Sequence, residues 1–163
     1  MDLVSLAKKI KLLILDCDGV LTDGKIYFTS EGTETIAFNV YDGYGILHLK
    51  NAGVEVAVIS GRKNSAVQHR LTQLNIQHVF LGHFDKITAF NRLIELVKIP
   101  LDHIAYVGDD LPDLDIMKKV ALPITVPNAM DAIKAVALMC TQKKGGDGAV
   151  REVCDFICEA QKP

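Results

Sequence analysis

The feature that most constrains the fold is a short apolar run, Leu12–Leu15, which is followed at once by two carboxylates, Asp16 and Asp18. Such a run is typical of a strand buried on both faces of a parallel sheet. Because carboxylates are costly inside a core, the strand should end near Asp16. Ligands of open α/β sheets bind beyond the carboxyl ends of the strands, so we expect a functional site here, with Gly19 letting the backbone turn. Alone, the residues would also suit an ordinary Asp-Gly turn or part of a calcium loop.

From residue 44 onward, apolar strand-like segments alternate with helical ones, which predicts right-handed crossovers and a parallel sheet. The expected fold class is therefore α/β, a Rossmann-like three-layer fold with a parallel central sheet. No segment leaves room for an inserted domain, so residues 1–163 are expected to form a single domain. Beyond the first strand, the expected strands are 54–60, 79–81, 104–108, 122–126 and 139–141. The expected helices are 42–51, 65–74, 85–98 or 88–98, 112–120, 129–137 and 149–160.

Residues 25–29 and 34–40 predict a β-hairpin, because β-branched and aromatic residues flank a turn that contains Gly32. Since it follows the carboxylate pair directly, this hairpin should stand over the site like a flap. Its apolar side chains occupy both faces, more than one small core can cover, so we expect it to lie in an interface between subunits. These side chains are Ile26, Tyr27, Phe28, Ile36 and Phe38.

The net charge of −2 gives no reason to expect a nucleic-acid or membrane-surface partner. No apolar run approaches the ~18 residues of a membrane span. The first nine residues place their lysines after their apolar residues, the wrong order for a secretory signal, so we expect a cytoplasmic protein. The cysteines form no C-x-x-C pair; we expect small packing residues, with a metal pair at Cys154 and Cys158 as the alternative. The four are Cys17, Cys140, Cys154 and Cys158.

Polar residues gather where four predicted strands end, which puts them on one edge of a parallel sheet. They are Asp16 and Asp18, Ser60-Gly61-Arg62, Lys86 at a helix start, and Asp109-Asp110 with Asp113. Acidic groups this close would repel each other, and a hard cation relieves the repulsion. Carboxylates, a backbone carbonyl and waters form an oxygen site suited to Mg²⁺. Each motif alone has an ordinary alternative, a turn, a solvated lysine or a helix cap, but the combination favours a site.

The cation and Lys86 would together form a positive pocket for a phosphate, with Ser60 and nearby backbone N–H groups as donors. Phosphoryl transfer needs positioning and charge neutralisation above all. A carboxylate can attack phosphorus and form an aspartyl-phosphate, and Asp16, at the strand end, is the natural nucleophile. Asp18 is placed to protonate the leaving oxygen and then to activate water.

These motifs, in this order, resemble those of the haloacid dehalogenase-like phosphatases, and the absence of an inserted cap domain resembles their capless subclass. Residues 16–24, 38–45, 60–62 and 144–152 resemble, more closely, the 3-deoxy-D-manno-octulosonate 8-phosphate phosphatases. The resemblance implies a Mg²⁺-dependent hydrolase that converts this sugar-acid phosphate to 3-deoxy-D-manno-octulosonate and phosphate, on the route to lipopolysaccharide. It also implies a homotetramer in which the hairpin and C-terminal tail of neighbouring subunits help to close each site.

The resemblance assigns a role to each matching residue. Asp16 is nucleophile and metal ligand, Asp18 is acid/base with its carbonyl on the metal, and Asp109 is the remaining metal ligand. Asp110 and Asp113 support the metal site. The residues implied to bind phosphate or substrate are Asn39, Asp42, Gly43, Ser60, Gly61, Arg62, Arg70 and Lys86.

Two positions depart from the family pattern, since Tyr41 stands where the family usually carries arginine and Leu47 stands where some members carry another. Losing these cations leaves open a related substrate, such as a nine-carbon nonulosonate phosphate, and also a non-catalytic assembly module of the same fold. A signalling receiver domain is the non-enzyme rival. Its acidic pair comes first and its lysine last, whereas here Lys86 precedes the second acidic cluster.

The tail Lys143–Glu152 places three glycines in four residues, which makes ordering costly in entropy. It also carries two lysines and Arg151. We expect it to close over bound substrate and to open for product release. The alternative is a solvated loop that caps the last helix.

Overall fold

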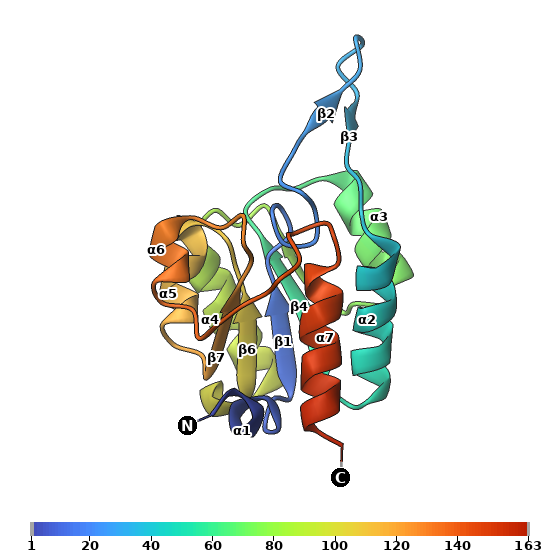
Figure 1. Ribbon diagram of the computed structural model, residues 1–163. Coiled ribbons are helices and arrows are strands. Elements are labelled where there is room, and N and C mark those ends of the chain that lie inside the picture. Colours follow the sequence, from blue (N-terminus) through green and yellow to red (C-terminus); the bar gives the residue numbers. More distant parts are fainter. Residues whose placement is uncertain (1, 163) are drawn as a thin grey trace.

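The computed structural model describes residues 2–162. At its centre lies a six-stranded sheet of order β5-β4-β1-β6-β7-β8, in which each neighbouring pair is parallel (Figure 1). The expected α/β class with a parallel central sheet is thus confirmed. The strands are β1 Leu12–Leu15, β4 Glu55–Ser60, β5 His78–Leu81, β6 Ile104–Val107, β7 Leu122–Thr125 and β8 Met139–Cys140.

The central strand β1 sets the position of the functional edge. All four of its residues are fully buried between β4 and β6, as a double-sided apolar strand requires. Leu15 lies level with Val58 of β4 and Val107 of β6. The N–H of Asp16 still donates to the Val107 carbonyl, at 3.0 Å. This register brings the residues that follow β1 and β6 out of the sheet side by side.

Helices cover both faces of the sheet (Figure 1). On one face lie α2 Val40–Asn51, α3 Ser65–Gln73 and α7 Ala149–Ala160, and on the other lie α4 Lys86–Val97, α5 Leu114–Met117 and α6 Asp131–Lys134. A short α1, Leu3–Ala7, lies at the end opposite the hairpin, and 3₁₀ turns span Leu101–His103 and Leu111–Asp113.

The helices predicted at 112–120 and 129–137 are shorter in the structure, as α5 and α6. Before α5, a capping box between Asp110 and Asp113, with a proline in the first turn, holds the chain as a 3₁₀ turn. Sequence periodicity does not distinguish that turn from the first turn of an α-helix.

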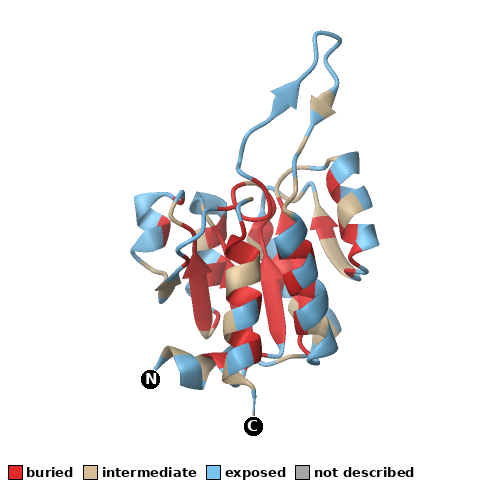
Figure 2. Ribbon diagram, turned by 45° about the vertical axis from the view of Figure 1, so that its right-hand side comes forward, coloured by how far each residue is buried: buried red, intermediate tan, exposed pale blue. Residues whose placement is uncertain are grey.

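The core lies in the sheet and on the inner sides of α2 and α7 (Figure 2). Along α7, Val150, Val153, Cys154 and Ile157 are fully buried, at the spacing of one helix face. All four cysteines are free thiols. Cys17, Cys154 and Cys158 are buried, as expected of packing residues, whereas Cys140 is exposed, and there the expectation was wrong.

The hairpin β2–β3 projects beyond the carboxyl edge of the sheet (Figure 1). Its paired strands are Tyr27–Phe28 and Glu34–Thr35, shorter than the predicted 25–29 and 34–40. Tyr27 and Phe28 are exposed, while Ile36 and Phe38 pack partly against the core of their own chain. A two-stranded ribbon without a packing partner is only marginally stable, which accounts for the short pairing.

Within residues 2–162, the structure contains no helix that is both long enough and apolar enough to cross a membrane.

Candidate active site

A pocket of about 300 Å³ opens at the carboxyl edge of the sheet, near the ends of β1, β4 and β6. The chain runs from β1 outward to β4 and β5 and then returns to β6 on the other side of β1. Such a reversal is where α/β sheets bind ligands. The pocket is lined by Asp16, Asp18, Gly24, Gly61, Arg62, Phe84, Lys86, Asp109, Asp110 and Pro112.

The floor of the pocket is a buried lysine between two buried aspartates. Lys86 Nζ lies 2.6 Å from Asp16 Oδ1 and 2.7 Å from Asp113 Oδ1. Each of the three side chains is at most 7% exposed. Charges this deep are tolerated only when they are paired and hydrogen-bonded, so the trio acts as one unit.

Both oxygens of Asp113 are engaged within the protein. Oδ1 accepts from Lys86 Nζ and, at 2.6 Å, from the hydroxyl of Tyr106. Oδ2 accepts from the backbone N–H groups of Asp109, at 3.0 Å, and Asp110, at 3.3 Å. Asp113 thereby fixes both Lys86 and the loop after β6, as its predicted supporting position would require.

Burial dominates the electrostatics of the acidic cluster. It raises the pKa of Asp16 well above the usual range, and the charge of Asp113 adds to the effect. It also raises the pKa of Asp109 to about 6. Burial opposes the charge of Lys86, but Asp16 and Asp113 outweigh it and raise that pKa. The Asp109 and Asp16 carboxyl groups each place an oxygen within 4.8 Å of the other. Two carboxylates this close require a shared proton or a cation.

The donor set fits a magnesium ion. Asp16, Asp109 and Asp113 each place a carboxylate oxygen within 4.8 Å of the others. Since Asp113 is already committed to internal hydrogen bonds, Asp16 and Asp109 are the carboxylates free to bind an ion. Asp16, which is buried, and Asp109, which is partly exposed, supply the carboxylate oxygens that Mg²⁺ prefers as ligands.

Asp18, Arg62 and Ser60 lie on the β4 side of the cluster. Asp18 Oδ1 is 3.5 Å from Arg62 Nη1. Ser60 is buried beneath the pocket wall, where its Oγ accepts the N–H of Arg62 at 3.3 Å. The structure therefore brings Asp18, Gly61 and Arg62 to the pocket surface, with Ser60 directly behind them.

The loop after β1 passes so close to Asp109 that only glycine fits at position 19. Gly19 has a φ of +84°, and a Cβ there would lie 1.9 Å from Asp109 Oδ2. The hydroxyl of Thr22 accepts the N–H groups of Gly19, at 3.3 Å, and Gly24, at 3.2 Å. These contacts hold the loop that carries Asp16 and Asp18 in a closed turn.

Four residues expected to contact substrate do not line this pocket. Asn39, Asp42, Gly43 and Arg70 instead line a separate cavity of about 10 Å³ beside α2. Asp42 Oδ1 accepts the N–H of Arg151 at 2.8 Å. Asn39 caps α2 by accepting the N–H of Tyr41 at 2.8 Å. Within one chain these residues hold helices in place, and their contact with substrate stays a prediction.

The glycine-rich tail is packed against the loop after β1 rather than solvated. The N–H of Gly146 donates to the Val20 carbonyl at 3.1 Å. Asn128 bridges the two segments, donating to the Gly19 carbonyl at 2.9 Å and accepting from the N–H of Gly145 at 2.9 Å. A Cβ on Gly145 would lie 1.8 Å from the Gly19 oxygen. The tail therefore underlies the loop that carries Asp16 and Asp18, which differs from the solvated loop expected as the alternative, while its closure over substrate stays a prediction.

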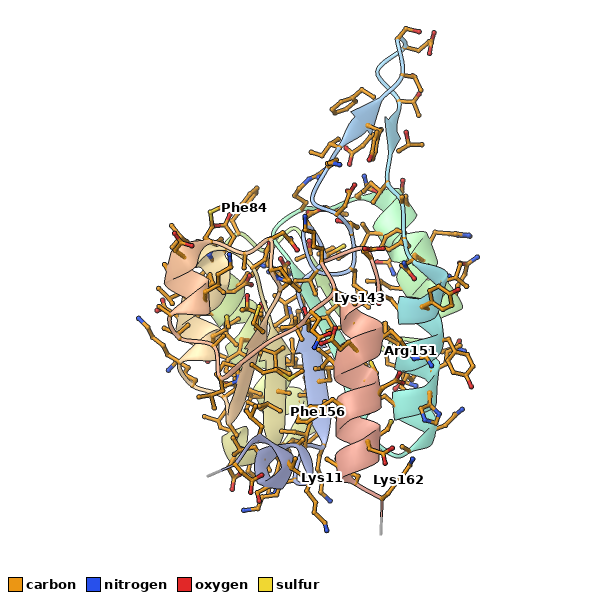
Figure 3. The ribbon with its side chains drawn as sticks, in the orientation of Figure 1. Lys11, Phe84, Lys143, Arg151, Phe156 and Lys162 are labelled. Carbon is orange, nitrogen blue, oxygen red and sulfur yellow. The ribbon has the colours of Figure 1, made fainter. Side chains whose placement is uncertain are left out.

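The side chain of Arg151, in the tail expected to close over substrate, lies between α7 and α2 rather than in the pocket (Figure 3). Its Nε bonds Asp155 at 2.7 Å, and its guanidinium carbon lies 4.9 Å from the centre of the Tyr44 ring. Phe84, 82% exposed at the pocket rim, was missed by the sequence analysis. The sequence also yielded no prediction for Glu34, Tyr106 and Asn128. Each is a single polar group whose hydrogen-bond partner belongs to another segment, and no local pattern marks such a group.

We expect Asp42 to make stability depend on pH. Burial, with a smaller contribution from Asp147, raises its pKa to about 6, although hydrogen bonds from N–H groups near the start of α7 oppose the shift. The folded value lies above the unfolded value of about 3.9. Its stabilising contribution is therefore complete below pH ~4 and is lost as the pH rises through about 6.

Asp42→Asn should remove this dependence. Relative to the variant, the unchanged protein should lose on the order of 2–3 kcal/mol between pH 4 and 7. Urea unfolding across that range, with chelator in both samples, measures the difference, and parallel profiles would contradict the assignment.

Comparisons with known proteins agree with this geometry. Residues 78–153 match the haloacid dehalogenase-like hydrolases. This class fits a parallel sheet that carries paired aspartates and a lysine at its carboxyl edge. Over 160 residues the chain is 46% identical to the 3-deoxy-D-manno-octulosonate 8-phosphate phosphatase of Escherichia coli strain K12, covering 98% of this chain and 85% of that protein.

Two solved structures extend the likeness to three dimensions. The phosphatase of that name from Moraxella catarrhalis, in complex with magnesium, phosphate and a KDO molecule, matches with 47% identity and a TM-score of 0.94, covering 97% of this chain and 91% of that one. The one from Yersinia pestis matches with 42% identity and a TM-score of 0.94, covering 97% and 85%. The chain therefore belongs to the 3-deoxy-D-manno-octulosonate 8-phosphate phosphatase family of haloacid dehalogenase-like hydrolases.

Proposed function

We propose that the protein is a Mg²⁺-dependent phosphatase that converts 3-deoxy-D-manno-octulosonate 8-phosphate to 3-deoxy-D-manno-octulosonate and phosphate, a step in lipopolysaccharide synthesis. The observation that carries the proposal is the Asp16–Lys86–Asp113 cluster beside Asp109, with Asp18 on the same pocket wall. It is supported by sequence identities of 46% and 47% to phosphatases named for this substrate, over 98% and 97% of the chain.

In the first step, an Asp16 oxygen attacks phosphorus, and the bond from phosphorus to the sugar oxygen breaks as Asp18 gives that oxygen its proton. The product of this step is an aspartyl-phosphate. In the second step, Asp18 takes a proton from a water, whose oxygen attacks phosphorus and releases phosphate and the Asp16 carboxylate. Lys86, 2.6 Å from Asp16 Oδ1, favours the charged form of this carboxylate and orients it.

Asp16, Asp109 and the Asp18 carbonyl would hold the magnesium ion. When bound, the ion supplies positive charge that neutralises the phosphoryl oxygens. Asp113 and Asp110 support its ligands through the loop after β6. Gly61, Arg62 and Lys86 line the pocket where the phosphate and sugar acid would bind, and Ser60 positions Arg62 from behind. Asn39, Asp42, Gly43 and Arg70 are proposed to contribute indirectly, through α2.

The two departures from the family pattern weigh little within one chain. Tyr41 and Leu47 are exposed on α2, and neither lines the pocket. Their exposed positions outside the pocket therefore give no reason, within one chain, to prefer a nine-carbon nonulosonate phosphate over the eight-carbon substrate.

The test is turnover by the purified protein. With Mg²⁺, we expect phosphate release from 3-deoxy-D-manno-octulosonate 8-phosphate at a higher kcat/KM than from nine-carbon sugar-acid phosphates, and none in excess chelator. Ca²⁺ should substitute poorly, because its looser and higher coordination misplaces the reacting groups. Preference for a nine-carbon substrate would replace the proposed specificity. Absence of turnover on all of them would favour a non-catalytic assembly module.

We further propose that residues 1–163 act as one domain in a cytoplasmic homotetramer. Free thiols at all four cysteines fit a reducing compartment. Exposed apolar side chains on the hairpin and α2 offer a surface for self-association: Tyr27, Phe28, Val40, Tyr41 and Tyr44. Light scattering at micromolar concentration should give the mass of four chains, and Phe28→Ser should weaken the assembly. A monomer would contradict the proposal.

A further inference from the structure

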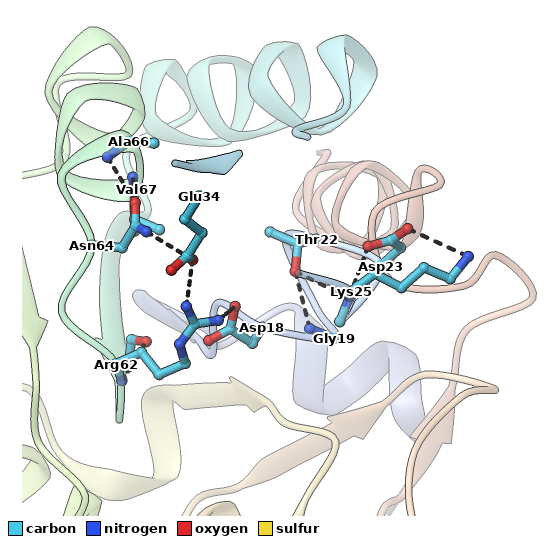
Figure 4. A network of polar contacts seen from close by, with 12 residues as sticks. Asp18, Gly19, Thr22, Asp23, Lys25, Glu34, Arg62, Asn64, Ala66 and Val67 are labelled. Carbon is cyan, nitrogen blue, oxygen red and sulfur yellow. Dashed lines mark hydrogen bonds and ion pairs between the residues drawn. The ribbon is translucent and has the colours of Figure 1, made fainter. Parts of the chain in front are cut away.

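The hairpin reaches the pocket wall through one side chain, Glu34 of β3 (Figure 4). Its carboxylate forms an ion pair with Arg62 Nη2 and accepts a hydrogen bond from Asn64 Nδ2 at 2.9 Å. Arg62 in turn directs Nη1 toward Asp18 Oδ1, at 3.5 Å. The Glu34 and Arg62 side chains are only 23% and 32% exposed. The contacts are therefore partly shielded from water, which strengthens them relative to a surface pair.

The two contacts of the guanidinium are unequal. A separation of 3.5 Å from Asp18 is at the outer limit of a hydrogen bond, whereas Glu34 binds Nη2 closely. Asn64 fixes the Glu34 carboxylate, and Asn64 is itself held because its side chain caps α3 by accepting the N–H of Ala66 at 2.8 Å. The orientation of Arg62 is thus set mainly from the hairpin side.

Without Glu34, the nearest remaining carboxylate recorded beside Arg62 is Asp18. The long arginine side chain would then move freely, because its 3.5 Å contact with Asp18 is too weak to hold it in one orientation. That movement would withdraw its donors from an incoming anionic group. Glu34 does not itself line the pocket, so any effect it has on substrate must pass through Arg62.

We propose that Glu34 is a positioning residue, which holds the Arg62 guanidinium at the pocket wall in the orientation that binds the acidic sugar of the substrate. This inference rests on the proposed function for the role of Arg62. It gives the hairpin a part in substrate binding within its own chain. Arginine suits this part because its planar donors match a carboxylate or phosphate.

The experiment compares Glu34→Gln with Glu31→Gln, a matched control at the exposed hairpin tip, where the Glu31 carboxylate accepts a hydrogen bond from the neighbouring Ser30 hydroxyl. For 3-deoxy-D-manno-octulosonate 8-phosphate, Glu34→Gln should raise KM by about tenfold, the order expected for one hydrogen bond to a charged group. The kcat should change little. With p-nitrophenyl phosphate, which has no sugar acid, neither variant should change KM. Equal effects on both substrates would indicate a general structural role and overturn the proposal.

A double-mutant cycle tests the route of the effect. In an Arg62→Ala background, Glu34→Gln should cause no further loss, because the guanidinium that Glu34 positions is gone. If the KM increases of the two single variants multiplied in the double variant, the proposal would be overturned.

A readout without substrate separates this inference from the proposed function. Side-chain ¹⁵N relaxation should show the Arg62 guanidinium ordered in the unchanged protein and in Glu31→Gln, but mobile on the nanosecond scale in Glu34→Gln. Unchanged order in Glu34→Gln would overturn the positioning role. Lack of sugar-acid turnover by the unchanged protein would count against the proposed function alone.

Discussion

Asp16→Asn should reduce turnover to background, a loss of at least about a thousandfold, because an amide cannot attack phosphorus in place of a carboxylate. The fold should survive the change. Lys86 keeps its second partner, Asp113 Oδ1, at 2.7 Å, and asparagine occupies nearly the same volume as aspartate. Removing one negative charge also relieves the crowding between Asp16 and Asp109. Phosphate release should be measured together with thermal unfolding followed by circular dichroism.

The matched control is Asp115→Asn, the same chemical change at an exposed position of α5. It should leave both turnover and melting temperature unchanged. If Asp16→Asn kept activity clearly above background while folded, Asp16 would not be the nucleophile. If both variants lost activity equally, the loss would have to be ascribed to something other than the carboxylate at position 16.

Lys86→Met should produce the largest loss of stability among single changes at the site. It leaves Asp16 and Asp113 buried without their shared cation, and breaking a buried pair in this way costs roughly 3–5 kcal/mol. For a chain of this size, the melting temperature should fall by on the order of 10 °C. Turnover should be lost as well, because the cation that orients the Asp16 carboxylate is gone.

Magnesium gives this prediction a second readout. Because the ion would bind the same acidic cluster, it should restore part of the lost melting temperature in Lys86→Met, by binding the folded state preferentially. The control, Lys118→Met on the exposed end of α5, should melt like the unchanged protein and respond to magnesium in the same way. A melting temperature for Lys86→Met equal to that of the control would contradict the account of the buried trio.

The sequence was sufficient to predict the sheet and the centre of the site, because both depend on local signals. Apolar runs mark the strands, and the polar residues that follow β1, β4 and β6 must meet at one edge once the strands are parallel. Glycine at position 19 and the capping box before α5 likewise depend on neighbouring residues.

The parts that could not be predicted are contacts between distant segments. Asn128 reaches Gly19 and Gly145, and Glu34 reaches Arg62, through side chains that local periodicity treats as ordinary surface groups. For the same reason, the contact between Asp42 and α7 could not be predicted. The Asp42 carboxylate accepts a hydrogen bond from the backbone N–H of Arg151, 109 residues along the chain. Only the packing of α2 on α7 brings the two groups together.

The contact between Gly145 and Gly19 has a consequence for synthesis. The turn that carries Asp16 and Asp18 is synthesised before the other strands of the sheet, but the segment on which it rests follows the last of them. A nascent chain that stops before residue 145 has its aspartates and lysine but lacks the backbone against which Gly19 packs. Phosphatase activity should therefore arise only after residue 145 has been synthesised, and products truncated before it should not form a partly active pool that consumes sugar phosphate.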